Sequence, residues 1–187
     1  MSDTAKQILD LAEALMLERG FNGFSYQHIS GALGMKNAAI HYHYPSKADL
    51  GVALVARYRR RFQRSVAQLD ATAQDPWVKL EWYFDVLSEL YGNSERLCPT
   101  GMLSAELATL PEAMQSEARQ FVDELYDWCV RVLRDGVQSG HFRFAGACED
   151  KAAMLLATLQ GALQLARFQP DWLDAVKKQA RLDLGAR

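Results

Sequence analysis

The sequence predicts an all-α protein with a small helical head followed by a larger helical body. Apolar side chains recur at helical spacing along most of the 187 residues. Capping residues and glycines mark the expected helix ends. No convincing run of alternating apolar and polar residues indicates a strand, and no internal repeat is evident. We therefore expect two parts, residues 1–50 and residues 51–187.

Composition sets the broad class. Apolar residues make up 49% and charged residues 24% of the chain, as in ordinary folded proteins. No secretory signal pattern opens the chain, and the most apolar segment, residues 152–166, is too short to span a bilayer. We expect a cytoplasmic protein with no membrane contact. The three cysteines are widely spaced, at Cys98, Cys129 and Cys148. That spacing favours neither a disulfide framework nor a metal site.

Charge is divided unequally along the chain. Residues 1–64 hold nine Lys and Arg against five Asp and Glu, whereas the remainder holds twelve against eighteen. A basic head on an acidic body indicates that the head meets a polyanion, although scattered surface charge is an alternative explanation.

The first two helices have clear start and stop signals. Thr4 and Gln7 form a capping box that opens the first helix, and Gly20 is its expected stop. Ser25 is the expected N-cap of a second helix that ends at Gly34.

The third and fourth helices follow closely. Residues 37–43 form a short third helix that Pro45 ends. Ser46 and Asp49 form a second capping box, which opens a fourth helix continuing to about Leu69. Asp75 with Pro76 starts the body's next helix. The body's helices are expected at residues 76–91, 100–109, 111–139, 149–168 and 171–184.

Helices of seven or eight residues are marginal alone, so the second and third must dock on the first and fourth. The expected core of the head is Ile8, Leu15, Phe21, Phe24, Ile29, Leu33, Ile40, Leu50 and Leu54. With Ile40 inward, Asn37, Ala38, His41 and Tyr42 share the outer face of the third helix.

That outer face has the chemistry of a DNA contact. Polar and aromatic side chains can bond base edges or phosphates, and alanine allows close approach. A helix N-terminus and lysines add phosphate contacts. The candidate DNA-binding residues are Ser25, Tyr26, Lys36, Asn37, Ala38, His41, Tyr42 and Lys47. As alternatives, Ser25 serves only as a cap and the lysines are solvated charges.

Three neighbouring features favour structural roles. His41 and His43, two apart on a helix, face opposite sides and do not share a metal ion. Tyr44 is expected in the core. The arginines between Arg57 and Arg64 are interpreted as a solvated helix face.

In this order, the motifs resemble the N-terminal signature of the TetR family of transcriptional regulators. The resemblance rests on Phe24-Ser25-Tyr26 through Ile29, Gly34 through Tyr44, and Ser46-Lys47-Ala48-Asp49-Leu50. It implies a helix-turn-helix head in which Ser25, Tyr26, His41, Tyr42 and Lys47 contact the DNA backbone and Asn37 and Ala38 face bases. Lys36 replaces a small hydroxyl residue, which would shift the helix cap to Asn37, and His41 replaces the first of two tyrosines.

The resemblance also implies that the body binds a small-molecule inducer. Aromatic, aliphatic and sulfur-containing side chains suit an apolar ligand, although at helical spacing they are more often plain core. The candidate ligand-binding residues are Trp82, Tyr83, Leu87, Cys98, Met102, Leu103, Phe121 and Trp128.

Cys98 is the most specific of these candidates. It precedes an expected helix start, where a thiol pKa can be lowered. Residues 97–107 resemble a segment of family members that respond to reactive electrophiles. Cys98 is thus either a covalent sensor or an inert small hydrophobic residue.

Apolar surface on the body indicates a homodimer. The helix over residues 149–168 is apolar on more than one face, and with residues 125–133 it could form a four-helix interface with its copy. The candidate interface residues are Leu125, Leu133, Leu155, Leu156, Leu159, Ala162 and Leu163. Burial inside one chain is the alternative.

Together these features predict a ligand-responsive regulator, a repressor released from a pseudo-palindromic operator by a small molecule or an electrophile. No catalytic motif, cofactor motif or metal motif is evident. The alternatives are a helical protein-binding adaptor and, less favoured, an enzyme. Salt distinguishes the adaptor, because DNA binding weakens steeply with salt and an apolar contact does not.

Overall fold

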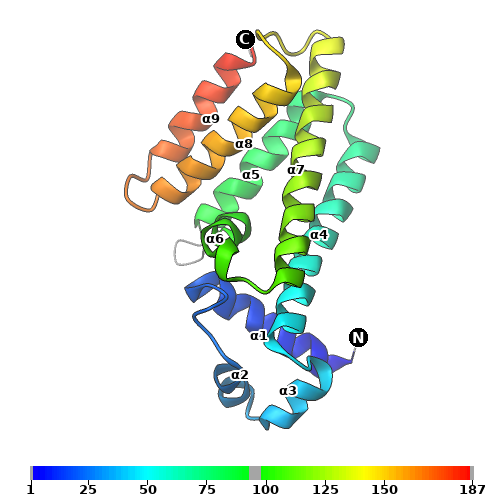
Figure 1. The fold of residues 1–187 in the computed structure, drawn as a ribbon. Helices are drawn as coiled ribbons and strands as arrows, with labels where there is room; N and C mark the ends of the chain where they lie inside the picture. Colours follow the sequence, from blue (N-terminus) through cyan, green and yellow to red (C-terminus); the bar gives the residue numbers. More distant parts are fainter. Residues whose placement is uncertain (1, 93–97, 186–187) are drawn as a thin grey trace. The chain divides into compact units, whose positions relative to one another are not determined.

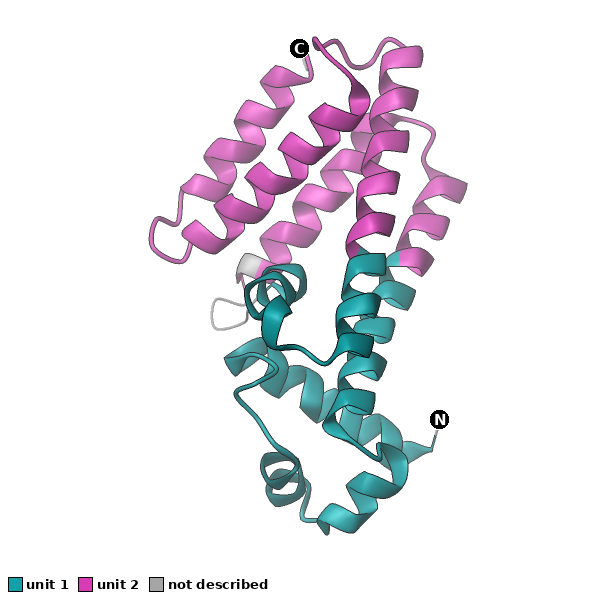
Figure 2. Ribbon diagram, viewed as in Figure 1, with its two compact units in different colours: residues 1–62, 95–121 teal, residues 63–94, 122–187 magenta. Residues whose placement is uncertain are grey.

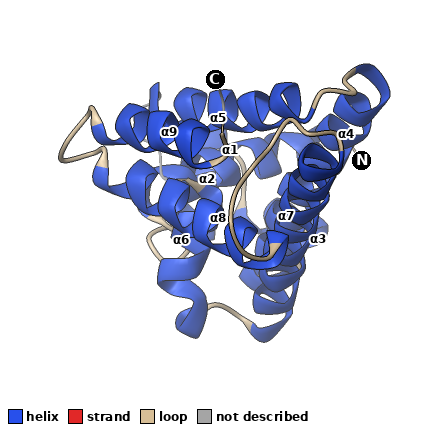
Figure 3. Cartoon of the chain, turned by 90° about the horizontal axis from the view of Figure 1, so that it is seen from above, coloured by secondary structure: helices blue, strands red, loops and turns tan. Residues whose placement is uncertain are grey.

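A computed structural model describes residues 2–92 and 98–185, and within them every regular element is a helix (Figure 3). This confirms the predicted all-α class. The elements are labelled in Figure 1. Their bounds are α1 (Asp3–Arg19), α2 (Tyr26–Leu33), α3 (Asn37–His43), α4 (Lys47–Thr72), α5 (Pro76–Gly92), α6 (Pro99–Glu106), a 3-10 turn η1 (Leu107–Thr109), α7 (Glu112–Gln138), α8 (Cys148–Leu165) and α9 (Trp172–Asp183).

Most predicted helix starts are confirmed. Asp49 accepts a hydrogen bond from the backbone N–H of Ser46 at 2.9 Å, and the Ser46 hydroxyl accepts one from the N–H of Asp49 at 3.1 Å. Asp75 caps α5 by accepting from the N–H of Trp77 at 2.8 Å. These side chains satisfy N–H groups that the first turn of a helix leaves unpaired.

Two predicted caps are wrong. The hydroxyl of Ser2, rather than that of Thr4, accepts from the N–H of Ala5 and opens α1. α3 begins directly after Lys36, so the cap does not shift to Asn37. Lys36 caps with its extended backbone alone, because its side chain has no acceptor.

The described chain divides into two compact units, coloured in Figure 2. Unit 1 comprises residues 1–62 and 95–121, and unit 2 comprises residues 63–94 and 122–187. The predicted division at residue 50 does not coincide with a unit boundary. The reason is that α4 continues without a break and that α6 and the start of α7 join the head in unit 1.

The core of unit 1 forms around the head. Seven of the nine predicted core side chains are buried, and Leu15 and Leu33 are half-buried at its edge. The same core takes in Met102, Leu103 and Met114. A Cβ placed on Gly51 would lie 2.5 Å from the Met114 sulfur, so glycine permits this close approach.

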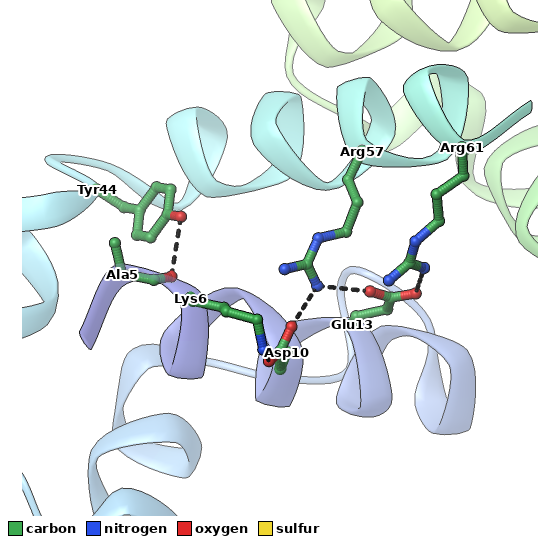
Figure 4. Close-up of polar contacts among 7 residues, drawn as sticks. All are labelled: Ala5, Lys6, Asp10, Glu13, Tyr44, Arg57 and Arg61. Atoms are coloured by element: carbon green, nitrogen blue, oxygen red, sulfur yellow. Dashed lines mark hydrogen bonds and ion pairs between the residues drawn. The ribbon is translucent and has the colours of Figure 1, made fainter. Parts of the chain in front are cut away.

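Ion pairs connect side chains of α1 with side chains of α4 (Figure 4). Arg57 pairs with Asp10 and with Glu13, each at 2.7 Å, and Arg61 also contacts Glu13. Arg59 pairs with Glu117 of α7 at 2.7 Å. The interpretation of the arginine run as a solvated face is therefore wrong for Arg57 and Arg59, which are largely buried, whereas Arg61 is exposed although it pairs with Glu13. The error arose because their acidic partners are distant in sequence.

In unit 2, α8 and α9 run side by side (Figure 1). Polar contacts also join α9 to α5. Lys177, though 8% exposed, donates to the Ser88 hydroxyl at 2.6 Å, and Arg181 forms a two-point ion pair with Glu81 at 2.6 and 2.5 Å. Such bidentate pairs fix the register between two helices.

Two further features are absent from the described residues. None of the described helices is long and apolar enough to cross a membrane. Within the same residues, no group of three or more His, Cys, Asp or Glu side chains could hold a metal ion.

Candidate DNA-binding surface

The outer face of α3 is the candidate surface. Ile40 is fully buried and anchors the helix, while Asn37, Ala38, His41 and Tyr42 are exposed. The Tyr42 side chain is 83% exposed, an unusual position for a large aromatic ring. The predicted inward and outward positions on this helix therefore agree with the structure.

His41 is held in a defined orientation. Its Nδ1 lies 2.9 Å from the carbonyl oxygen of Pro45. Its ring packs edge-on against Tyr26, with the ring centroids 4.8 Å apart. The remaining edge of the imidazole, with Nε2, is thus left for an external partner.

Ser25 and Tyr26 have structural roles at the start of α2. The N–H of Ser25 donates to Nδ1 of His28 at 3.0 Å. Tyr26 is buried, and its hydroxyl donates to the carbonyl oxygen of Tyr44 at 2.8 Å. Burial, with Asp49 and Tyr44 nearby, raises the pKa of Tyr26 to about 12. The Tyr26 side chain therefore faces the core, and what it can offer a phosphate is its backbone N–H. Tyr44 is buried as predicted.

The two lysines differ in their surroundings. Lys36 is exposed in the turn before α3. The Lys47 ammonium is half-buried and lies 4.5 and 4.6 Å from the ring centroids of Phe21 and Phe24. Burial lowers the pKa of Lys47, and the Glu106 carboxylate opposes that change. Both lysines remain available as cations on the head.

Glu106 is a residue that the sequence analysis missed. Its carboxylate accepts from the N–H of Phe21 at 2.8 Å and from the N–H of Asn22 at 3.4 Å. Asn22 in turn donates to the Thr109 hydroxyl at 2.8 Å. A Cβ placed on Gly20 would lie 2.4 Å from Glu106 Oε1, so the glycine makes room for the carboxylate. The end of α6 and η1 thereby hold the turn between α1 and α2.

The candidate ligand residues fall into two groups. In unit 2, Trp82 and Tyr83 each pack edge-on against Trp128, with centroids 5.7 Å apart, and Leu87 is buried. In unit 1, the buried side chains are Cys98, Met102, Leu103 and Phe121. The Cys98 sulfur, at the N-cap of α6, lies 3.1 Å from the Thr100 hydroxyl.

The candidate dimer residues lie mostly inside the chain. Six of the seven are buried by the chain itself, and Leu156 is half-buried. The exposed apolar side chains of α8, α9 and the turn between them are different ones: Met154, Leu165, Phe168, Trp172 and Leu182. A second copy would therefore meet these side chains first.

Comparison with known proteins identifies the class. Residues 8–54 match the family model of bacterial regulatory proteins, tetR family, and residues 79–179 match a tetracyclin repressor-like C-terminal domain. The chain belongs to the TetR family. It is a DNA-binding transcriptional regulator with an N-terminal helix-turn-helix and a C-terminal helical domain.

Individual relatives agree with this assignment. A TetR-family transcriptional regulator from Agrobacterium tumefaciens has a crystal structure that superposes with a TM-score of 0.91 and 31% identity, covering 97% of this chain and 98% of that one. The transcriptional repressor DhaR of Mycobacterium sp. is 23% identical over 84% of this chain and 79% of its own length. The transcriptional repressor NemR of Escherichia coli K12 is 24% identical over 86% and 82%.

Proposed function

We propose that this chain is a homodimeric repressor that places α3 of each head in the major groove of a pseudo-palindromic operator and leaves the DNA when a small molecule binds. The outer face of α3 is the observation that carries the proposal, because Ile40 anchors a helix whose exposed side chains can bond bases and phosphates. Two relatives named as repressors support repression over activation.

The DNA test uses duplexes selected from a random-sequence pool by the purified full-length protein. Replacing Lys36 with alanine would remove a phosphate contact, so we expect weaker binding to all duplexes. The slope of log affinity against log salt concentration should become less steep by about one. Lys178→Ala, an exposed lysine on α9, is the matched control and leaves both properties unchanged. Equal effects of the two variants would contradict the assignment of Lys36.

The dimer is proposed to form through the exposed side of α8. Met154, Gly161 and Leu165 recur at spacings of seven and four residues and therefore share one side of α8, and Phe168 follows in the turn after this helix. Their side chains are apolar and exposed, apart from the glycine. A Cβ at Gly161 would meet nothing within 4 Å, so the chain's own packing does not require glycine there. A two-fold axis near Gly161 would bring two α8 helices close together.

Sedimentation velocity at micromolar concentration tests this interface. Wild-type protein is expected to sediment as a dimer, and Gly161→Leu as a folded monomer, because the added side chain occupies the space of the partner helix. Gly31→Leu, at an exposed helical glycine of unit 1 that also has open space around it, is the control and stays dimeric. A dimeric Gly161→Leu variant would place the interface elsewhere.

The inducer is proposed to act on the residues that the sequence marked for ligand binding. A ligand releases DNA only as far as it prefers the form that does not fit the operator. Apolar ligands suit the cluster of Trp82, Tyr83 and Trp128. Binding is tested by tryptophan fluorescence, with Tyr83→Ala expected to weaken it.

An electrophile is the second proposed class of inducer, with Cys98 as its target. The sulfur would bond to the β-carbon of an α,β-unsaturated aldehyde, and the thiol proton would move to the α-carbon, so no group leaves. Acrolein is the probe, and Cys98→Ala should abolish its release of DNA while Cys148→Ala should not. Burial raises the pKa of Cys129 to about 12, which keeps that thiol protonated. Release that survives in Cys98→Ala would end this part of the proposal.

A further inference from the structure

We propose that His41 makes DNA binding by this protein dependent on proton uptake, because only its protonated ring can donate a hydrogen bond to a phosphate from the exposed edge. The inference rests on the proposed function, since it requires the outer face of α3 to contact DNA. The geometry of the ring carries it.

The backbone selects which nitrogen of His41 holds a proton. Nδ1 lies 2.9 Å from the carbonyl oxygen of Pro45. A carbonyl oxygen can only accept, so Nδ1 must be the donor. In the neutral ring, Nε2 therefore carries a lone pair and no hydrogen. Phosphate oxygens are also acceptors, so a neutral His41 meets them with a repulsive lone pair.

Protonation reverses that contact. A second proton on Nε2 creates a donor and a positive charge at the exposed edge, while the bond from Nδ1 to Pro45 is kept. Among side chains, histidine is the type that serves as a pH switch in proteins, so the contact is examined at acidic and alkaline pH. A tyrosine or an amide at this position would offer a donor at every such pH.

Neighbouring side chains keep the ring in place. Tyr26 packs edge-on against it from α2, and the Tyr26 hydroxyl is itself bonded to the carbonyl of Tyr44. The turn that supplies the Pro45 carbonyl is fixed by the hydrogen bonds between Ser46 and Asp49. The imidazole thus has support from both α2 and the start of α4.

The other charged groups around His41 have identifiable roles. Tyr26 stays neutral because burial raises its pKa to about 12. The Asp49 carboxylate accepts from Ser46, and the Lys47 ammonium lies over two aromatic rings. On α3 itself, His43 packs edge-on against Tyr42, with centroids 5.0 Å apart.

His28 would respond to pH in the opposite sense. Its Nδ1 accepts from the backbone N–H of Ser25, so protonation of Nδ1 would remove a helix cap. Acid would then weaken the head through His28 and strengthen phosphate contact through His41. The sign of the pH effect on DNA affinity therefore separates the two histidines.

The first measurement needs no DNA. Long-range ¹H–¹⁵N correlation spectra of histidine-labelled, full-length protein at pH 8 report the tautomer, and His41→Gln assigns the signals. We expect His41 protonated at Nδ1 and unprotonated at Nε2. A neutral His41 with its proton on Nε2 would overturn the inference.

The second measurement is the Kd for a duplex selected by wild-type protein from a random-sequence pool at pH 6.5. At constant ionic strength, we expect affinity to fall about tenfold per head between pH 6 and pH 8, the usual size of a charge-assisted hydrogen bond. His41→Tyr and His41→Gln should remove this dependence. His43→Gln and His141→Gln, the latter in unit 2, should retain it.

The outcomes separate this inference from the function on which it rests. A selected duplex bound with equal affinity from pH 6 to pH 8 would overturn the inference alone. A pH dependence of DNA affinity that persists in His41→Gln, or disappears in His43→Gln, would also overturn the inference. Failure to select any duplex would overturn the proposed function together with the inference.

Discussion

The two units expose opposite kinds of aromatic surface. In unit 1, Tyr42 is 83% exposed and stands beside Asn37 and His41 on α3. In unit 2, Phe168 is 80% exposed in the turn after α8, on which Met154 and Leu165 are also exposed. A tyrosine among polar neighbours suits a wet, charged partner, whereas a phenylalanine among aliphatic neighbours suits another protein surface. The difference therefore supports the proposal that unit 1 contacts DNA and that unit 2 contacts a second copy of the chain.

The units also differ in how their exposed helices are anchored. The seven residues of α3 rely on the buried Ile40 and on backbone bonds at the turn, because so short a helix is unstable alone. By contrast, α8 is eighteen residues long and buries five of its side chains against its own unit. We therefore expect a single core substitution to displace α3, the helix proposed to face DNA, more readily than α8.

The largest predicted effect tests that anchor. Ile40→Ala deletes a fully buried side chain and should lower the free energy of unfolding by about 3 kcal/mol, with DNA binding lost. Leu159→Ala, fully buried in α8, should cost a similar amount without selective loss of DNA binding. Chemical denaturation and DNA titration of both variants check the pair. Normal DNA affinity in folded Ile40→Ala would show that α3 is not the reading helix.

The next predictions compare the removal of the two exposed rings, Tyr42 in unit 1 and Phe168 in unit 2. Tyr42→Ala should weaken DNA binding by about 1 to 2 kcal/mol and leave the dimer intact, because a ring and a hydroxyl contact are lost. Phe168→Ala should weaken self-association by a similar amount, about 1 to 2 kcal/mol. Sedimentation velocity and DNA titration of both variants check these two expectations. The comparison fails if Tyr42→Ala dissociates the dimer.

A smaller effect concerns the contact that supports the α1–α2 turn. Glu106→Gln keeps an acceptor for the N–H of Phe21 but loses the charge, and should destabilise the protein by about 1 kcal/mol. Asp123→Asn, exposed on α7, is the control and should change stability little. Hydrogen exchange at Phe21 and Asn22 should rise only in Glu106→Gln. Unchanged exchange would mean that the carboxylate does not hold this turn.

The smallest effect is a response to acid. The hydrogen bond from Lys6 is the largest influence and lowers the pKa of Asp10 below its ordinary value of 3.8; burial opposes it, and Arg57 lowers the pKa further. A lowered native pKa means that Asp10 contributes stability above its unfolded pKa and loses it as the pH falls through the native one. Because Asp10 is exposed, we expect less than about 1 kcal/mol. Denaturation curves of Asp10→Asn and wild type should therefore converge below about pH 3. A constant difference at all pH values would contradict this origin.

Local sequence signals predicted much of the fold. Helix caps such as those of Ser46 and Asp75, and the inward position of Ile40, depend on residues a few positions apart, so they could be read directly. Where two hydroxyl residues compete, as Ser2 and Thr4 do, local signals did not decide which one opens α1.

Contacts across long sequence separations could not be predicted. Arg57 contacts Glu13, and Arg59 contacts Glu117, only after α1, α4 and α7 pack together. The sequence alone therefore indicated that these arginines were solvated. Glu106 has no local pattern that points to Phe21. Similarly, apolar periodicity on α8 could not separate the side chains that the chain buries, such as Leu159, from those it leaves exposed, such as Phe168.

The exposure of the candidate DNA-binding side chains was predicted better than the exposure of the candidate dimer side chains. The third helix has one buried anchor, so its outer face followed from periodicity. Tyr26 was the exception, because a tyrosine at a helix start can turn either way and here its hydroxyl bonds to Tyr44 inside the head.

The most direct test of the account is binding of the purified wild-type protein to DNA fragments from upstream of its own gene, at 50 and 200 mM salt. We expect one fragment to bind selectively, with affinity falling about a thousandfold or more between the two salt concentrations, as phosphate contacts from two heads require. Fragments that bind without preference, or with an affinity that salt leaves unchanged, would contradict a sequence-reading head.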